Sequence, residues 1–238
     1  MTAGARPDAE AHEHTHADVS GGWLRAAVFG AMDGLVTNTA LVAGVGGGGA
    51  APRAIVLAGV ASLVAGAISM ALGEYTSVQT QNEQLELEVE KERRELARNP
   101  AGELDELVEM LRVRGVDDRL ARKVAVQLSR DPETALRLHV VAELGLDPED
   151  RPSPVVAAVS FVTFGIGALI PLVPFLAGVS VLWPALVAGG IGLLAAGAIS
   201  SRFTPRPWWY AGARQLIFGA AAAGITYLVG SAIGVSVS

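Results

Sequence analysis

The sequence contains no cysteine, and its long apolar segments contain only two acidic residues, Asp33 and Glu74. Without cysteine the chain forms neither disulfides nor thiolate metal sites, and its redox compartment cannot be read from the sequence. Aromatic residues make up only 5% of the 238 positions, whereas hydrophobic residues make up 51%. With a mean hydropathy of +0.41, the chain is too apolar for an ordinary soluble protein of this size.

Five segments are long and apolar enough to cross a bilayer, which requires ~20 residues of helix. They are residues 23–45, 54–72, 155–176, 181–200 and 208–235. The polar residues 1–20 are followed by an apolar run that is too long for a signal peptide, so we expect no cleaved leader. We therefore predict an all-α membrane protein with a disordered tail (1–20), two membrane helices in residues 21–82 and three in residues 151–238.

Residues 83–150 carry the negative charge of the chain. They contain 18 acidic and 11 basic residues, a balance of −7, whereas the rest of the chain has a balance of +1. This charge argues against nucleic-acid binding. Residues 77–98 lack Gly and Pro, so the second membrane helix is expected to continue out of the bilayer until Asn99-Pro100 stops it. Three further helices are expected, at about residues 103–114, 118–129 and 132–145, capped by Asp117 or Asp118 and by Asp131.

The positions of the arginines predict the orientation in the membrane. The positive-inside rule places the N-terminus and residues 83–150 in the cytoplasm and the C-terminus outside. Arg53 is the one exception. The residues that support this orientation are Arg6, Arg25, Arg202, Arg206 and Arg214. Aromatic residues at the expected interfaces, such as Trp183 and Trp208, fit the same arrangement.

The first candidate site lies inside the membrane. A carboxylate at bilayer depth costs roughly 2.5–3.5 kcal/mol, so Asp33 is expected to have a partner or a transported ion. Met70 lies one helical turn before Glu74, and its thioether favours Fe²⁺ or a similar ion over Mg²⁺ or Ca²⁺. The alternative is that Asp33 is a buried structural acid and that Met70 only fills the core. Additional oxygen ligands could come from Thr37, Asn38 and Ser69.

The second candidate site lies in the acidic segment. Glu92 and Glu95 are spaced i, i+3 before the Pro-containing turn, and Glu103 and Glu106 repeat this spacing after it. If the two helices fold back on each other, the four carboxylates converge, as they do in helical iron sites. His139 and Glu143 (i, i+4) belong to the last helix. Among 18 acidic residues such pairs also arise by chance. The tail residues His12, Glu13, His14 and His16 are either a loose metal collector or simply disordered.

Two motifs in the membrane segments resemble the vacuolar iron transporter family, which has many prokaryotic members. They are RAAVFGAMDGLVTN at residues 25–38 and AGAISMALGEY at residues 65–75. The Glu-rich segment ending in AELGL (142–146) and the weaker match ALIPLVP (168–174) follow in the family's order. Together the matches extend over nearly the whole chain from Trp23.

The resemblance implies a homodimer of five-span protomers that exchanges Fe²⁺, and Mn²⁺ as a further candidate, for protons. The family's pathway runs along the dimer interface, and its aspartate and methionine match Asp33 and Met70. Its cytoplasmic metal-binding glutamates match Glu92, Glu95, Glu103, Glu106 and Glu143. Two positions depart from the family pattern. His139-Val140 lies where relatives can carry methionine, and Met32 replaces a common asparagine.

The sequence therefore predicts a proton-coupled exporter of Fe²⁺, with no permanent cofactor and no enzymatic activity. Mn²⁺, Co²⁺ and Zn²⁺ remain open as further substrates. The expected location is a prokaryotic inner membrane. One alternative is a membrane-anchored ferritin-like oxidase, although the acidic segment lacks the Glu-x-x-His pairs of such enzymes. The other is a non-transporting scaffold whose acidic helices bind a protein partner, which leaves Asp33 unexplained.

Overall fold

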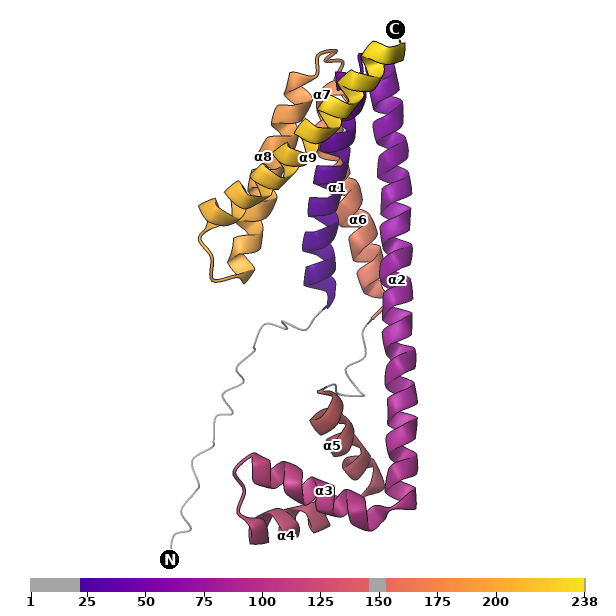
Figure 1. The fold of residues 1–238 in the computed structure, drawn as a ribbon, viewed down its shortest axis with the longest axis vertical. Coiled ribbons are helices and arrows are strands. Elements are labelled where there is room, and N and C mark those ends of the chain that lie inside the picture. The colour runs from indigo at the N-terminus through magenta and orange to yellow at the C-terminus, as the bar shows by residue number, and fades with distance from the viewer. Residues whose placement is uncertain (1–21, 146–152, 238) are drawn as a thin grey trace, which may run out of the picture.

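The computed structural model describes residues 22–145 and 153–237, and every regular element in this part of the chain is a helix (Figure 1). Five helices are long and apolar enough to cross a membrane. Figure 1 shows them as a bundle, with a smaller group of helices at the opposite end of the molecule and the long helix α2 joining the two. The prediction of an all-α membrane protein with five spans is confirmed.

The spans agree with the expected segments to within two residues, except that the second is far longer. Their helices are α1 (Gly22–Gly47), α2 (Pro52–Arg98), α6 (Val155–Leu169), α8 (Trp183–Ser200) and α9 (Trp208–Val237). The third span is not one regular helix. It continues through η1 (Ile170–Leu172) and α7 (Val173–Leu176), because Pro171 and Pro174 have no N–H to continue the α-helical hydrogen bonding. A short turn, η2 (Ser201–Phe203), follows α8.

Helix α1 lies at the centre of the bundle, where it packs against α6, α9, α8 and α2. Glycines allow its backbone to approach α6 closely. A Cβ on Gly34 would collide with the backbone oxygen of Phe164, and a Cβ on Gly167 would collide with that of Ala31. Small residues are the usual solution for closely packed membrane helices, since lipid provides no hydrophobic force between them.

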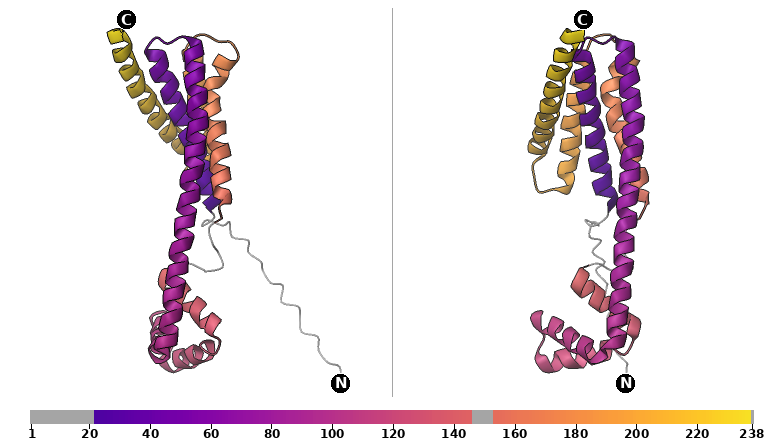
Figure 2. Two further views of the ribbon diagram at one scale, coloured as in Figure 1. Left: turned by 90° about the vertical axis from the view of Figure 1, so that its right-hand side faces the viewer. Right: turned by 45° about the vertical axis from the view of Figure 1, so that its right-hand side comes forward.

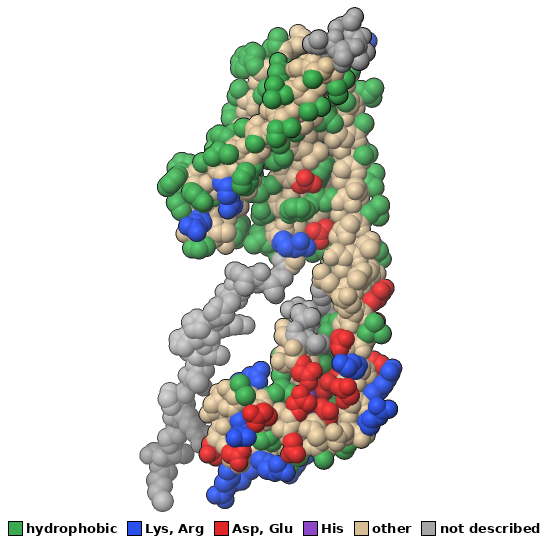
Figure 3. Space-filling view, viewed as in Figure 1, with side chains coloured by type: hydrophobic (Ala, Val, Ile, Leu, Met, Phe, Trp, Pro, Cys, Tyr) green, Lys and Arg blue, Asp and Glu red, His purple; other side chains and the backbone are tan. Residues whose placement is uncertain are grey.

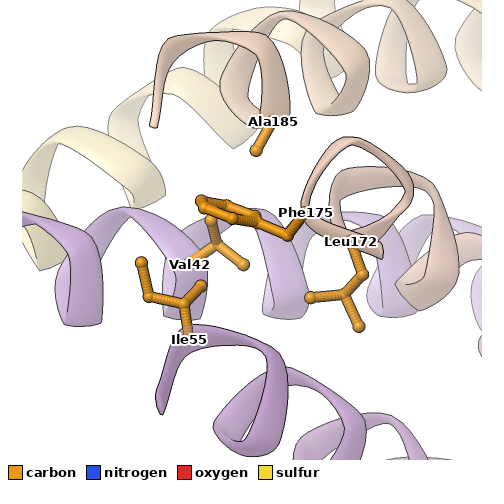
Figure 4. Close-up of a cluster of buried hydrophobic side chains, with 5 residues drawn as sticks. All are labelled: Val42, Ile55, Leu172, Phe175 and Ala185. Atoms are coloured by element: carbon orange, nitrogen blue, oxygen red, sulfur yellow. The ribbon is translucent and has the colours of Figure 1, made fainter. Parts of the chain in front are cut away.

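A cluster of buried side chains closes the end of the bundle opposite the acidic helices. It brings together Val42 of α1, Ile55 of α2, Leu172 and Phe175 of the interrupted third span, and Ala185 of α8 (Figure 4). Figure 4 shows the Phe175 ring lying between Val42 and Ala185. Helices α1, α2 and α8 and the interrupted third span are thereby held together at this end of the bundle.

Helix α2 runs without interruption for 47 residues, from the apolar bundle into the acidic helices (Figure 2). It ends at Arg98, where Asn99 leaves the helix and its side-chain oxygen accepts a hydrogen bond from the Gly102 N–H at 3.2 Å. The next helix, α3, begins immediately at Pro100. The expected continuation of the second span and its stop at Asn99-Pro100 are confirmed.

The acidic end of the molecule consists of α3 (Pro100–Val113), α4 (Asp118–Leu128) and α5 (Pro132–Leu144). Helices α3 and α5 pack against α2, and α4 packs against α3. Helix α3 begins three residues earlier than expected. Asp117 caps α4 and Asp131 caps α5, while Gly145 ends α5 with a left-handed φ of 66°. Leu85 of α2 packs against Leu136 and Val140 of α5, which fixes α5 against α2.

Candidate metal sites

Three helices bring Glu92, Glu103 and His139 to one point in the acidic end. Glu92 comes from α2, Glu103 from the first turn of α3 after the Asn99-Pro100 turn, and His139 from α5. One ligand atom from each residue lies within 4.8 Å of the others. Metal–ligand bonds of about 2.0–2.2 Å place two ligand atoms up to about 4.4 Å apart, so a small contraction would let these three share one ion.

The buried atoms of this cluster lack protein partners. His139 Nδ1 lies 3.3 Å from Glu92 Oε1, 3.6 Å from Glu103 Oε2 and 3.9 Å from Glu143 Oε1. The His139 and Glu92 side chains are only 1% and 7% exposed. Nevertheless, within the described residues, both ring nitrogens of His139 and Glu92 Oε1 have no hydrogen-bond partner, because the 3.3 Å contact is poorly aligned for one. Such buried, unsatisfied atoms are costly, and a bound cation would satisfy them.

The protonation of the cluster depends on the crowding of its carboxylates. Burial is the largest cause, and together with the negative charges of neighbouring carboxylates it raises the pKa of Glu92 from 4.5 to about 7. Those charges belong to Glu143, Glu103, Glu95 and Glu106, in decreasing order of effect. Burial also raises the pKa of Glu103 and of Glu143, while His139 opposes both shifts. All five glutamates identified from the sequence therefore affect one another, but only Glu92 and Glu103 form the compact group with His139.

Within the membrane helices, Asp33 is half-buried and accepts a hydrogen bond from Thr37 Oγ1 at 3.3 Å. The two residues are one turn apart on α1. In the described part of the chain, no basic side chain pairs with Asp33. A carboxylate at this depth whose only partner is a hydroxyl is costly to keep ionised, and a cation would stabilise it.

Met70 and Asn38, which were also predicted for the membrane site, contact other residues than Asp33. Met70 is partly buried against a cluster of Ala67, Phe164 and Ala168. Asn38 is fully buried, and its amide donates to the Gly59 carbonyl of α2 at 3.1 Å and to the Ala168 carbonyl of α6 at 2.7 Å. Asn38 therefore joins three helices, and its Oδ1 has no partner among the described residues. It projects about 140° away from Asp33 around α1, since five residues make 1.4 helical turns.

Glu74 pairs with Arg25, a residue that in the sequence served only to predict the orientation of the chain in the membrane. Arg25 Nη2 of α1 lies 3.0 Å from Glu74 Oε2 and 3.3 Å from Oε1. The Glu74 side chain is 9% exposed and that of Arg25 is 65% exposed. One signal was present in the sequence: Arg25 and Glu74 are the base and the acid at the ends of two neighbouring spans that face the acidic segment. The tail residues His12, Glu13, His14 and His16 lie outside the described residues.

Comparison with known proteins identifies the family of the chain. The model of the VIT family matches residues 24–231. A vacuolar iron transporter of Acanthamoeba castellanii is 37% identical over 208 residues, which are 82% of this chain and 76% of the relative. Vacuolar iron transporter 1 of Oryza sativa subsp. japonica is 30% identical over 233 residues, 94% of this chain and 92% of the relative. This multi-pass membrane protein therefore belongs to the VIT family.

Proposed function

We propose that this protein exports Fe²⁺ from the cytoplasm in exchange for protons. The observation that carries the proposal is Asp33, a half-buried carboxylate in a membrane helix with a hydroxyl partner and no basic partner among the described residues. A mobile cation, either a metal ion or a proton, stabilises such a group. The relatives named vacuolar iron transporter support iron as the transported metal.

The cytoplasmic cluster of Glu92, Glu103 and His139 supports metal capture before transport. Two carboxylates and an imidazole suit divalent transition metals such as Fe²⁺, Mn²⁺, Co²⁺ and Zn²⁺ better than they suit Mg²⁺ or Ca²⁺, which prefer oxygen ligands alone. Glu95, Glu106 and Glu143 add negative charge around this group and concentrate cations near it. The metal is cargo here and not a resident cofactor.

Competition between protons and metal for the same oxygens couples the two flows. A carboxylate that binds a metal ion must first lose its proton, so protons arriving from the far side release the metal from Asp33. Export of net positive charge against the membrane potential costs ~2.3 kcal/mol per charge per 100 mV, and returning protons offset part of this cost. Met70 adds a thioether that favours Fe²⁺. In a homodimer, Asp33 and Met70 would face their counterparts across the two-fold axis.

The test is Fe²⁺ uptake into anaerobic proteoliposomes under an imposed pH gradient, with wild type beside Asp33→Asn. We expect the variant to insert and fold normally but to lose proton-coupled uptake, because the amide cannot exchange a proton for a metal ion. Asp118→Asn, a change at an exposed carboxylate of α4, is the control and should transport normally. Wild-type rates in Asp33→Asn would contradict the proposal. If wild type shows no flux but consumes oxygen in a metal-dependent way in a separate aerobic assay, a ferritin-like oxidase is favoured instead.

A further inference from the structure

The ion pair between Arg25 and Glu74 lies at the cytoplasmic end of the membrane helices, below Asp33. Arg25, Phe29, Asp33 and Thr37 follow one another at intervals of four residues along α1, so they form one stripe on that helix. Phe29 is 57% exposed, and Asp33 and Thr37 are half-buried. On α2, Met70 lies one turn above Glu74 in the same direction. An ion moving from the cytoplasm toward Asp33 therefore meets this pair first.

The two partners differ greatly in their burial within the protomer. The Glu74 side chain is 9% exposed, so its carboxylate gains little hydration if Arg25 leaves, and a buried, ionised carboxylate without a cation is strongly unfavourable. The Arg25 side chain is 65% exposed within the protomer and belongs to the first turn of α1, at the end of the membrane span, so its guanidinium can leave Glu74 with little movement of the backbone. While it is ionised, Glu74 consequently needs a cation, whereas Arg25 does not need Glu74.

We propose that Arg25 is a tethered cation that occupies Glu74 until a divalent metal ion displaces it, so that the pair gates the cytoplasmic entrance to Asp33. This inference rests on the proposed function, because it assumes that metal ions enter along the α1 stripe. With Arg25 in place, a fixed positive charge closes the entrance to cations. Once a metal ion takes the carboxylate, the guanidinium moves into solvent and the ion continues toward Met70 and Asp33. Monovalent ions compete poorly, since they offer Glu74 no more charge than Arg25 does.

The absence of cysteine from the sequence allows a test that does not depend on transport. Thr37→Cys introduces a single thiol on the α1 stripe beyond Asp33, and its modification by a small cationic methanethiosulfonate reagent added from the cytoplasmic side reports whether the entrance is open. We expect Arg25→Ala to raise the labelling rate about fivefold, the equivalent of ~1 kcal/mol for an ion pair with one exposed partner. Arg25→Lys should stay near the wild-type rate. Arg214→Ala is the matched control, because it removes an exposed arginine from the start of α9.

A charge exchange separates gating from a structural role. In Arg25→Glu/Glu74→Arg the pair re-forms, but the buried member is now a cation that no metal ion can bind. We expect this variant to keep the thermal stability and the slow labelling of wild type but to lose Fe²⁺ uptake. A purely structural pair predicts instead that the variant keeps both the stability and the uptake of wild type. If Arg25→Ala does not fold, Arg25→Ala/Glu74→Gln leaves no unpaired buried charge and should still label faster.

Two outcomes would overturn the gate: wild-type labelling rates in the variants that lack Arg25, or restored Fe²⁺ uptake in the exchanged pair. Failure of the proposed function looks different, because wild-type protein would then carry no Fe²⁺ even where the labelling rates respond to Arg25. In active protein, Arg25→Ala should also lower the half-saturating Fe²⁺ concentration, since the metal no longer competes with a tethered cation.

Discussion

Among the described residues, His139 is the only histidine, and it lies almost completely buried among carboxylates. Its nearest neighbours are Glu92 and Glu103, whose pKa values are raised mainly by burial. In the absence of metal, the cluster therefore holds protons near neutral pH. A metal ion that binds here replaces those protons, so capture must depend on pH.

We predict that Mn²⁺, used as an air-stable probe, binds the cytoplasmic cluster about tenfold more tightly at pH 8 than at pH 6, because a group with a pKa near 7 goes from mostly protonated to mostly ionised over this range. Calorimetric titration of the purified full-length protein would measure the difference. Glu92→Gln should weaken binding and flatten its pH dependence, whereas Asp131→Asn, at an exposed cap of α5, should change neither. Equal affinities at both pH values would contradict the raised pKa.

The raised pKa of Glu92 also makes the stability of the metal-free protein depend on pH. The pKa of Glu92 is higher in the folded protein than its ordinary value of 4.5, so the folded state binds the proton more tightly than the unfolded state. The stabilisation due to this proton is complete below pH 4.5 and is lost as pH rises through about 7. Saturating metal should reverse this trend, because it stabilises the ionised carboxylates.

The local part of the site could be predicted from the sequence, and the long-range part could not. Glu92 and Glu103 flank a turn that Asn99-Pro100 encodes locally, so their approach follows from short-range rules. The pairing of Arg25 with Glu74 joins residues 49 positions apart, and it depends on how α1 and α2 pack. Spacing alone contains no information on that packing.

The long-range contacts of Asn38 likewise could not be predicted from the sequence. Its oxygen and nitrogen made it a candidate ligand, but its amide instead bonds carbonyls on two neighbouring helices. The Ala168 carbonyl needs such a donor because the third span changes to a 3₁₀ turn just after it, at Ile170–Leu172. Pro171 and Pro174 cause that interruption. The sequence had instead suggested one continuous helix over residues 155–176.

Helix α2 connects the two ends of the molecule, and its middle has little support from neighbours. Residues 79–81 are exposed and make mainly local hydrogen bonds, such as Thr80 Oγ1 to the Thr76 carbonyl. The helix crosses this region because residues 77–98 contain no Gly or Pro. Its continuity is therefore the physical link between the acidic helices and the membrane helices.

We predict that Thr80→Pro uncouples metal capture from transport. Proline inside a helix costs ~3 kcal/mol or more, because it removes one hydrogen bond and its ring clashes with the preceding turn. The cytoplasmic cluster, whose ligands all lie beyond the break, should still bind Mn²⁺, while Fe²⁺ uptake should fall sharply. Thr80→Ala is the control and should behave as wild type. Full uptake in Thr80→Pro would show that the connection need not be rigid.

Glycine makes the close packing of α1 on α6 possible. We predict that Gly34→Ala lowers the free energy of unfolding by about 1–3 kcal/mol, because the added methyl group meets the backbone of Phe164, which cannot move aside. Gly165→Ala is the matched control, since a Cβ there meets nothing within 4 Å. Thermal unfolding in detergent would compare the two variants. Equal melting temperatures would mean that α1 and α6 can separate without loss.

Charged side chains and apolar side chains are concentrated at opposite ends of the molecule. Figure 3 shows acidic side chains gathered over the lower helices, while apolar side chains cover most of the upper bundle. The cluster of Glu92, Glu103 and His139 lies where α2, α3 and α5 meet, whereas Asp33 lies in α1 of the apolar bundle. Helix α2 joins these two parts of the molecule (Figure 1). Under the proposed function, this arrangement separates the collection of an ion from its passage through the membrane.

This division makes a kinetic prediction for the combined variant Glu92→Gln/Glu103→Gln/His139→Ala. The half-saturating Fe²⁺ concentration should rise at least about tenfold, as expected when metal ligands are lost. The maximal uptake rate should stay close to that of wild type, because Asp33 and the membrane pathway are untouched. Uptake measured over a range of Fe²⁺ concentrations in proteoliposomes separates the two parameters.

The matched control is Glu83→Gln/Glu88→Gln/Asp118→Asn, which removes exposed acidic residues outside the cluster. It lowers the negative charge by three, whereas the cluster variant lowers it by two, so general electrostatic attraction predicts at least as large an effect for the control. Specific capture predicts a large effect for the cluster variant alone. If the cluster variant instead lost its maximal rate at unchanged half-saturation, the acidic helices would take part in translocation itself, and the separation of capture from passage would be wrong.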